Sequence, residues 1–234
     1  MKNGKIILIF GIIITIVIAY ISSSIGDLID LKINFIPRSF GVHTLMFSLS
    51  IIAIILLKKY VNFQISIPKF KRIIKPILFG FLASVITNMI MMSIIVSTNG
   101  TDGAELQIPT SNMSVLQIFI FVFVYASIAE EMLFRGFLLN FLNPLKNKGI
   151  KFLKRKISFP IIISAIMFGL SHLILLEPEG NNIFVLGIVI SASILGIIAG
   201  YYQEKYNNNA YSILVHMAGN LIGVIGTIVM NVNS

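Results

Sequence analysis

At the centre of the sequence stand seven residues, Ala129–Glu130–Glu131–Met132–Leu133–Phe134–Arg135. They lie inside an otherwise apolar run from about Leu116 to Leu142. An ionisable side chain near the middle of a bilayer costs at least about 2.5–3.5 kcal/mol on insertion scales. Three such side chains so close together therefore indicate either a functional site or a buried network of ion pairs.

Helical spacing gives the two glutamates different roles. Each residue of an α-helix advances by about 100°, so Glu131 and Arg135 lie on one face and can pair. Glu130 and Arg135 point well apart. We therefore expect Arg135 to neutralise Glu131, which leaves Glu130 in the position of a general base or a metal ligand. The alternative is that all three charges only lock helices together.

The composition indicates a membrane protein. Of the 234 residues, 56% are hydrophobic and 12% charged, and the mean hydropathy is +0.94. Such a chain cannot present a charged surface to water on all sides. It has no cysteine, which excludes disulfides, thiolate catalysis and cysteine metal sites. The net charge of +9 is explained by basic residues in the segments that connect the apolar runs, so no nucleic-acid partner is expected.

The sequence predicts an all-α fold, a polytopic membrane bundle of about seven transmembrane helices with its catalytic core in the fourth to seventh. We place the boundary between the two parts of the chain at residue 115, giving 1–115 and 116–234. The apolar runs are about Ile6–Ile21, Gly41–Leu57, Pro76–Val96, Leu116–Leu142, Ile157–Leu176, Ile183–Tyr202 and Ala210–Met230.

The charges of the connecting segments alternate along the chain. One set of ends holds most of the basic residues, including the segments Lys58–Lys75 and Lys146–Lys156, which we expect to lie on the membrane surface. The opposite set collects the acids Asp27, Asp30, Asp102, Glu105, Glu177 and Glu179. By the positive-inside rule, we expect a multi-pass protein of the cell membrane with a cytoplasmic N-terminus and an outside C-terminus.

Two later spans bring polar groups into apolar surroundings. Phe168 and His172 share a helical face in the fifth span, as do His216 and Asn220 in the seventh. With a rise of about 1.5 Å per residue, Glu130 and His172 both lie roughly 18 Å from one end of their spans, and Asn220 roughly 15 Å. These depths are compatible with one shared site. His43, alone near the start of the second span, reads as structural.

Small residues favour close helix packing in the last two spans. Ala192, Gly196 and Gly200 line one face of the sixth span, and Gly219 and Gly223 flank Asn220 in the seventh. Small side chains let membrane helices approach closely.

A carboxylate, two imidazoles and an amide are sufficient to hydrolyse an amide bond. Glu130 could take a proton from water that His172 helps to orient, while His216 and Asn220 donate to the developing oxyanion. Alternatively, Glu130, His172 and His216 could hold Zn²⁺ with a water in the fourth position. No HExxH pair is present and the ligands would come from three helices, so we favour a site without metal or other cofactor.

The ordered set Glu130-Glu131-x-x-x-Arg135, Phe168-x-x-x-His172 and His216-x-x-x-Asn220 resembles the three motifs of the CAAX protease and bacteriocin-processing family (CPBP, or Abi) of intramembrane endopeptidases. The resemblance covers roughly 116–230. It implies a protease in which Glu130 and His172 activate water and His216 and Asn220 form the oxyanion hole. Glu131, Arg135 and the motif residue Phe168 would then support the site.

The resemblance also implies a polypeptide substrate. Members of this family process prenylated CaaX proteins, mature bacteriocins or confer self-immunity, or process peptide signals. We expect a small or membrane-associated substrate that enters as an extended segment from the lipid or the cytoplasmic side, with the two basic segments at the entrance. The competing functions are an ion-coupled transporter and a non-catalytic immunity or scaffold protein. The spans show no duplicated halves, which is unlike the usual transporter architecture.

Overall fold

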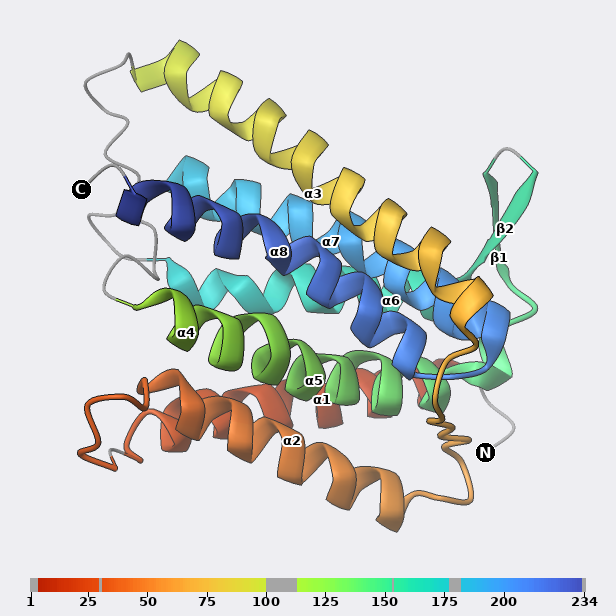
Figure 1. Cartoon of the computed structure of the whole chain (residues 1–234). Coiled ribbons are helices and arrows are strands. Elements are labelled where there is room, and N and C mark those ends of the chain that lie inside the picture. Colours follow the sequence, from red (N-terminus) through yellow and green to blue (C-terminus); the bar gives the residue numbers. More distant parts are fainter. Residues whose placement is uncertain (1–3, 30, 100–112, 153, 177–181, 233–234) are drawn as a thin grey trace.

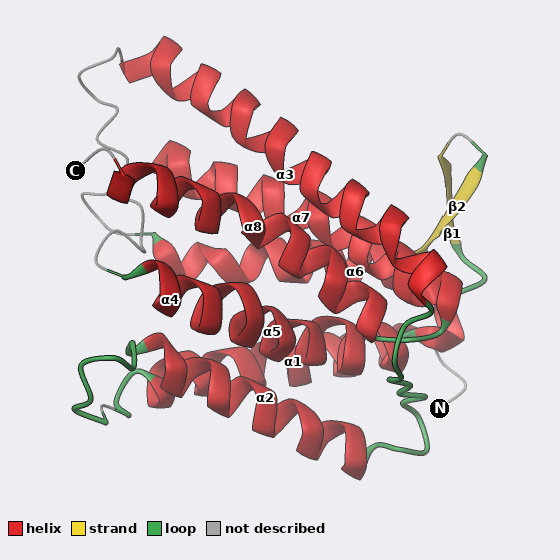
Figure 2. Cartoon of the chain, in the orientation of Figure 1, coloured by secondary structure: helices red, strands yellow, loops and turns green. Residues whose placement is uncertain are grey.

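The structure, a computed structural model, describes residues 4–29, 31–99, 113–152, 154–176 and 182–232. This part of the chain is a helical bundle with one small β-hairpin (Figure 2). Six of its elements are α-helices of 13 or more residues: α1 Gly4–Gly26, α2 Ser39–Leu56, α3 Phe70–Asn99, α6 Phe159–Ser171, α7 Asn182–Tyr206 and α8 Ala210–Val232. The predicted helical membrane bundle is confirmed.

The fourth span is a composite helix. It runs through α4 Val115–Gln117, η1 Ile118–Ala126, α5 Ser127–Glu131 and η2 Met132–Leu139, where η1 and η2 have π-helical hydrogen bonding. A capping box starts it, because the Ser114 hydroxyl accepts from the Gln117 N–H and the Gln117 amide oxygen accepts from the Ser114 N–H. π-helical segments are rare and frequently occur at functional sites.

All seven predicted spans are helical, and six of them are long and apolar enough to cross a membrane. The exception is the fifth, predicted over Ile157–Leu176. Its helix α6 begins only after Ser158, whose hydroxyl accepts from the Ile161 N–H, and Pro160 occupies the first turn. At its far end α6 tightens into the 3₁₀ turn η4 His172–Leu175. The fifth element is therefore a shorter apolar helix, Phe159–Leu175.

The composite fourth span lies in the middle of the bundle (Figure 1). The helices α1 and α2 pack on one side of it, α8 packs on the other, and α3 lies outermost against α7 and α8. The helix α6 packs against α7 and η2. The side chains of η2 are all buried and supply much of the main hydrophobic core, including Leu133, Phe134, Phe137 and Leu138.

Small residues allow two of these contacts. A Cβ on Gly196 of α7 would lie 3.0 Å from the Cα of Ala165 in α6, so the close approach predicted at Gly196 is confirmed. A Cβ on Gly80 of α3 would collide with the backbone carbonyl of Val215 in α8. The prediction is wrong at Gly223, where no atom lies within 4 Å of such a Cβ.

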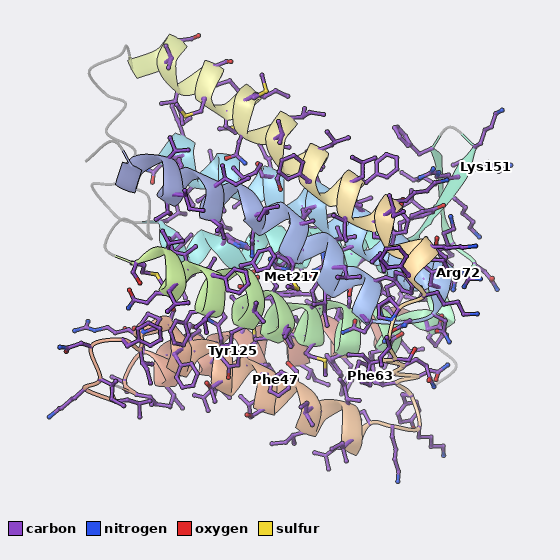
Figure 3. All side chains as sticks on the ribbon, viewed as in Figure 1. Phe47, Phe63, Arg72, Tyr125, Lys151 and Met217 are labelled. Carbon is purple, nitrogen blue, oxygen red and sulfur yellow. The ribbon has the colours of Figure 1, made fainter. Side chains whose placement is uncertain are left out.

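Most of the basic residues gather at one end of the bundle, where Figure 3 labels Arg72 and Lys151. There the segment 146–156 does not form the simple surface segment that its composition predicts. It contains strand β1 Gly149–Phe152, which pairs antiparallel with β2 Arg155–Ser158. The acids Asp30, Asp102, Glu105, Glu177 and Glu179 lie outside the described residues.

Candidate active site

A fully buried ion pair joins α5 to η2. The Nη1 atom of Arg135 donates to Oε1 of Glu131 over 2.8 Å, and neither side chain is more than 1% exposed. This is the pair that helical spacing predicts. Such a pair offsets most of the cost of burying its two charges, whereas either charge alone would be strongly unfavourable in the apolar interior.

The surroundings of Arg135 are shaped to its guanidinium. Its central carbon lies 4.6 Å from the ring centroid of Phe168, at cation–π distance. Gly196 supplies the remaining space, because a Cβ there would collide with Nη2 of Arg135. Two guanidinium nitrogens, Nε and Nη2, have no hydrogen-bond partner within the described part of the chain. Arg135 is thus held chiefly by Glu131 and the aromatic ring.

His216 of α8 connects the two glutamates. Its Nδ1 atom lies 3.0 Å from Oε1 of Glu131, and its Nε2 atom lies 3.7 Å from Oε2 of Glu130. Because the Glu131 oxygen already accepts from Arg135 in an ion pair, we assign Nδ1 of His216 as the donor of this hydrogen bond. The imidazole is therefore fixed in orientation, with Nε2 directed to the side of Glu130.

His172 is held in a different way at the junction of α6 and η4. Its Nδ1 atom lies 3.0 Å from the backbone oxygen of Phe168, one turn earlier. A carbonyl can only accept, so Nδ1 carries the hydrogen and Nε2 of the neutral ring carries a lone pair. The Phe168 ring packs edge-on against both His172 and His216, with centroid distances of 5.1 Å. Phe168 therefore sets the position of both imidazoles.

Asn220 lies one turn beyond His216 on α8. Its Nδ2 atom donates to Oγ of Ser127 over 3.1 Å and to the backbone oxygen of Val122 over 3.3 Å. Ser127 in turn donates to the backbone oxygen of Phe123. Both amide hydrogens of Asn220 are therefore engaged, and one has to be released before the amide can donate to another group.

A cavity of about 750 Å³ brings four of the predicted residues together: Glu130, His172, His216 and Asn220. The supporting residues Glu131, Arg135 and Phe168 are not among its lining and lie behind it, in contact with His216 or with each other. The polar residues share the cavity with many apolar side chains of α1, α2 and α6, which include Ile16, Ala19, Val42, Met46, Met167 and Leu170.

The cavity extends toward the end of the bundle opposite the basic residues. Its lining reaches Ser23 near the end of α1, Ser39 at the start of α2 and Leu175 at the end of η4. None of the lining residues comes from 58–75 or 146–156, so this cavity gives no support to the predicted entrance beside these basic segments. The first of them packs instead against the α7–α8 connection, where the Asn209 N–H donates to the Gln64 oxygen.

The structure adds a residue that the sequence analysis took for structural. His43 of α2 places Nε2 at 3.3 Å from Oε1 of Glu130, and both side chains are 17% exposed. All three histidines of the chain therefore line the same cavity. The rarity of histidine in apolar runs was a usable signal, but nothing in local spacing connects His43 with Glu130.

The residues considered for zinc are Glu130, His172 and His216. Within the described part of the chain, no group of three or more His, Asp or Glu side chains is arranged to hold a metal ion. The nearest neighbours of the Glu130 carboxylate are the imidazoles of His43 and His216, one at each oxygen. The arrangement suits hydrogen bonding to a carboxylate.

The fold and the site define a class of protein. It is a multi-pass helical membrane protein with a cavity among its helices that is lined by a carboxylate, imidazoles and an amide. A family model narrows this class. Residues 112–222 match the model described as "Type II CAAX prenyl endopeptidase Rce1-like", so the predicted resemblance to this family of intramembrane endopeptidases is confirmed over that part of the chain. Neither a search of curated proteins nor a search of solved structures gave a match.

We predict that Glu131 and Arg135 stabilise the fold as a unit. Glu131→Gln and Arg135→Met should each lower the free energy of unfolding by about 3–5 kcal/mol, because each leaves an uncompensated buried group. The double variant should lose much less than the sum, since it removes both charges. The measurement is the free energy of unfolding in detergent micelles for the wild type, the two single variants and the double variant.

The control for this cycle is an ion pair whose lysine is half exposed and whose glutamate, Glu204, is 13% exposed. Lys146 lies 3.7 Å from Glu204 with its side chain 47% exposed, so Lys146→Met should change the free energy of unfolding by less than about 1 kcal/mol. Strictly additive losses in the double variant would contradict the assigned pair.

Proposed function

We propose that this protein is an endopeptidase that cleaves a peptide bond in a membrane-associated polypeptide, using Glu130 to activate water. The observation that carries the proposal is that Glu130, His172, His216 and Asn220, all from the part of the chain that matches the endopeptidase family, converge on one cavity. The roles of the individual residues follow from their hydrogen bonds.

The first step is attack of water on the scissile carbonyl. Glu130 accepts a proton from the water, while Nε2 of the neutral His172 accepts a hydrogen bond from the second hydrogen, which stays on the attacking oxygen, and so orients the water. Each carboxylate oxygen can accept more than one hydrogen bond, so the contacts of Glu130 with His43 and His216 leave room for the water. Such positioned base catalysis contributes typically 10²–10⁴-fold in rate.

The oxyanion forms on the carbonyl oxygen as the new C–O bond forms. His216 donates to it from Nε2 while Nδ1 remains bonded to Glu131, which requires the protonated imidazole. With His216 charged, the two glutamates are balanced by His216 and Arg135. Asn220 supplies the second donor by releasing one of its two bonds. The C–N bond then breaks as Glu130 returns its proton to the leaving amine.

The cavity supports an apolar polypeptide segment as substrate. Apart from the polar residues already named, most of its wall consists of aliphatic, methionine and aromatic side chains, which come from α1, α2, the fourth span, α6 and η4. Burying apolar side chains of the substrate there contributes about 25 cal/mol per Å² of area removed from water. An extended apolar stretch gains from this wall, whereas a folded soluble domain does not fit among the helices.

We predict that Glu130→Gln abolishes cleavage while leaving the protein folded. The amide keeps the size of the side chain but cannot accept the proton of water, so the loss should be at least about 100-fold. The measurement compares membrane and secreted peptides from cells that carry wild type, Glu130→Gln or no copy. A fragment made only with the wild-type protein identifies the substrate.

Unfolding in detergent controls for folding in this comparison, because Glu130→Gln should melt close to the wild type. A product that still forms with the folded Glu130→Gln variant would refute the assigned base. A transport or immunity phenotype that survives the substitution, without any Glu130-dependent product, would favour a carrier or scaffold function instead.

We further propose that the reaction needs no metal, so cleavage by purified protein should persist after chelation. The assay uses a peptide that spans the cleavage site found above, with and without a zinc chelator, alongside metal analysis of the purified protein. About one equivalent of zinc, lost together with activity and restored on adding the metal back, would overturn the proposal in favour of Glu130, His172 and His216 as ligands.

We also propose that the basic end of the bundle faces the cytoplasm. The lysines and arginines of 58–75 and 146–156 support this by the positive-inside rule. The cavity, which extends toward the opposite end, would then receive its substrate from the outer side. Reporters fused after Ser234 and within 146–156 should report outside and cytoplasmic locations respectively. The reverse pattern would invert the bundle and the side of substrate entry.

A further inference from the structure

We propose that His43 is a positioning residue for Glu130. Its imidazole donates from Nε2 to Oε1 of the carboxylate and holds it turned toward the cavity. This proposal rests on the proposed function for its catalytic consequence, but the contact itself is independent of any reaction. His43 lies on α2, outside residues 112–222, so the match to the endopeptidase family assigns nothing to it.

The contact is made between two constrained side chains. His43 Nε2 and Glu130 Oε1 are 3.3 Å apart, and both residues line the cavity while remaining mostly buried. The other ring nitrogen of His43, Nδ1, is buried and has no hydrogen-bond partner among the described residues. A neutral ring with its hydrogen on Nε2 explains both facts, because Nδ1 then carries a lone pair and Glu130 receives the donor.

The register of α2 against the fourth span is independently fixed next to His43. Thr44 donates its hydroxyl hydrogen to the Phe40 backbone oxygen, so in its 2.8 Å bond with Tyr125 the tyrosine is the donor. The rings of Phe40 and Tyr125 stack with centroids 5.2 Å apart. These contacts determine which residue of α2 faces α5, and they place His43 beside Glu130.

Each of the two histidines lies next to a different oxygen of the Glu130 carboxylate. His43 lies at Oε1 and His216 at Oε2, from helices on opposite sides of the fourth span. Without His43, the carboxylate would be restrained at one oxygen only and could rotate about its last bonds. A base that has to meet water in one geometry loses rate when it gains such freedom.

His43→Ala should therefore reduce kcat by about 10- to 100-fold, the size expected for a hydrogen bond to a charged group, with little change in KM. The assay uses the peptide identified with wild type and Glu130→Gln. His43→Gln restores an N–H donor near the same place and should recover much of the loss.

The matched control is Ser50→Ala, which removes another buried polar side chain of α2. Among the described residues, Ser50 bonds only to the Met46 backbone oxygen of its own helix, and it does not line the cavity. Its loss should leave kcat unchanged. A His43→Ala effect on KM alone would overturn the positioning role in favour of direct contact with substrate.

A second measurement does not depend on activity. A hydrophobic carbodiimide labels carboxyl groups in apolar sites, and mass spectrometry gives the rate at Glu130. Because Glu130 loses its hydrogen-bond partner, His43→Ala should change this rate by about tenfold, whereas Ser50→Ala should not. Equal rates would refute the contact. If Glu130→Gln still makes product, the proposed function fails while the labelling result still decides the contact.

Discussion

A guanidinium that is completely removed from water has to be neutralised, and in this bundle Glu131 does so from one helical turn away. The pair also fixes the positions of neighbouring side chains on other helices. Glu131 also receives His216 from α8, and Arg135 packs against Phe168 of α6 and Gly196 of α7. Three helices, α6, α7 and α8, therefore pack against this one ion pair. Because an unpaired partner would leave a buried charge, these contacts have little freedom to rearrange.

The backbone beneath the pair is adapted to the same purpose. In η2 the π-helical pattern interrupts the regular series of i to i+4 hydrogen bonds, and side chains donate to the backbone there. The carbonyl oxygen of Arg135 accepts from Nδ2 of Asn140 over 3.0 Å and from Nε2 of Gln203 over 2.9 Å. Gln203 belongs to α7, so the bond that satisfies the backbone also joins two spans. A buried carbonyl left without these donors would carry a desolvation cost of about 1–3 kcal/mol.

Features that depend on local spacing could be predicted from the sequence. The pair Glu131–Arg135 and the packing of Phe168 beside His172 both follow from one helical turn, and the apolar runs define the helices. Features that depend on how helices meet could not. His43 is 87 residues from Glu130, and its role becomes visible only when α2 is placed against α5. The shortened fifth helix likewise results from a hairpin that takes Ile157 into a strand.

Glu130 and Glu131 are neighbours in sequence and differ because the helix turns them apart. Glu131 faces α8 and is bound by Arg135 and His216, whereas Glu130 faces the cavity that α1 and α2 help to enclose. The side chains that we propose for hydrolysis come from residues 112–222, while part of the apolar wall comes from α1 and α2, outside that segment. Under the proposed function, substitutions in that wall would change which segment fits without changing the proposed base or oxyanion donors. His43 is the exception, since it belongs to the wall and yet contacts Glu130, and this contact would connect α2 to the proposed chemistry as well as to the substrate.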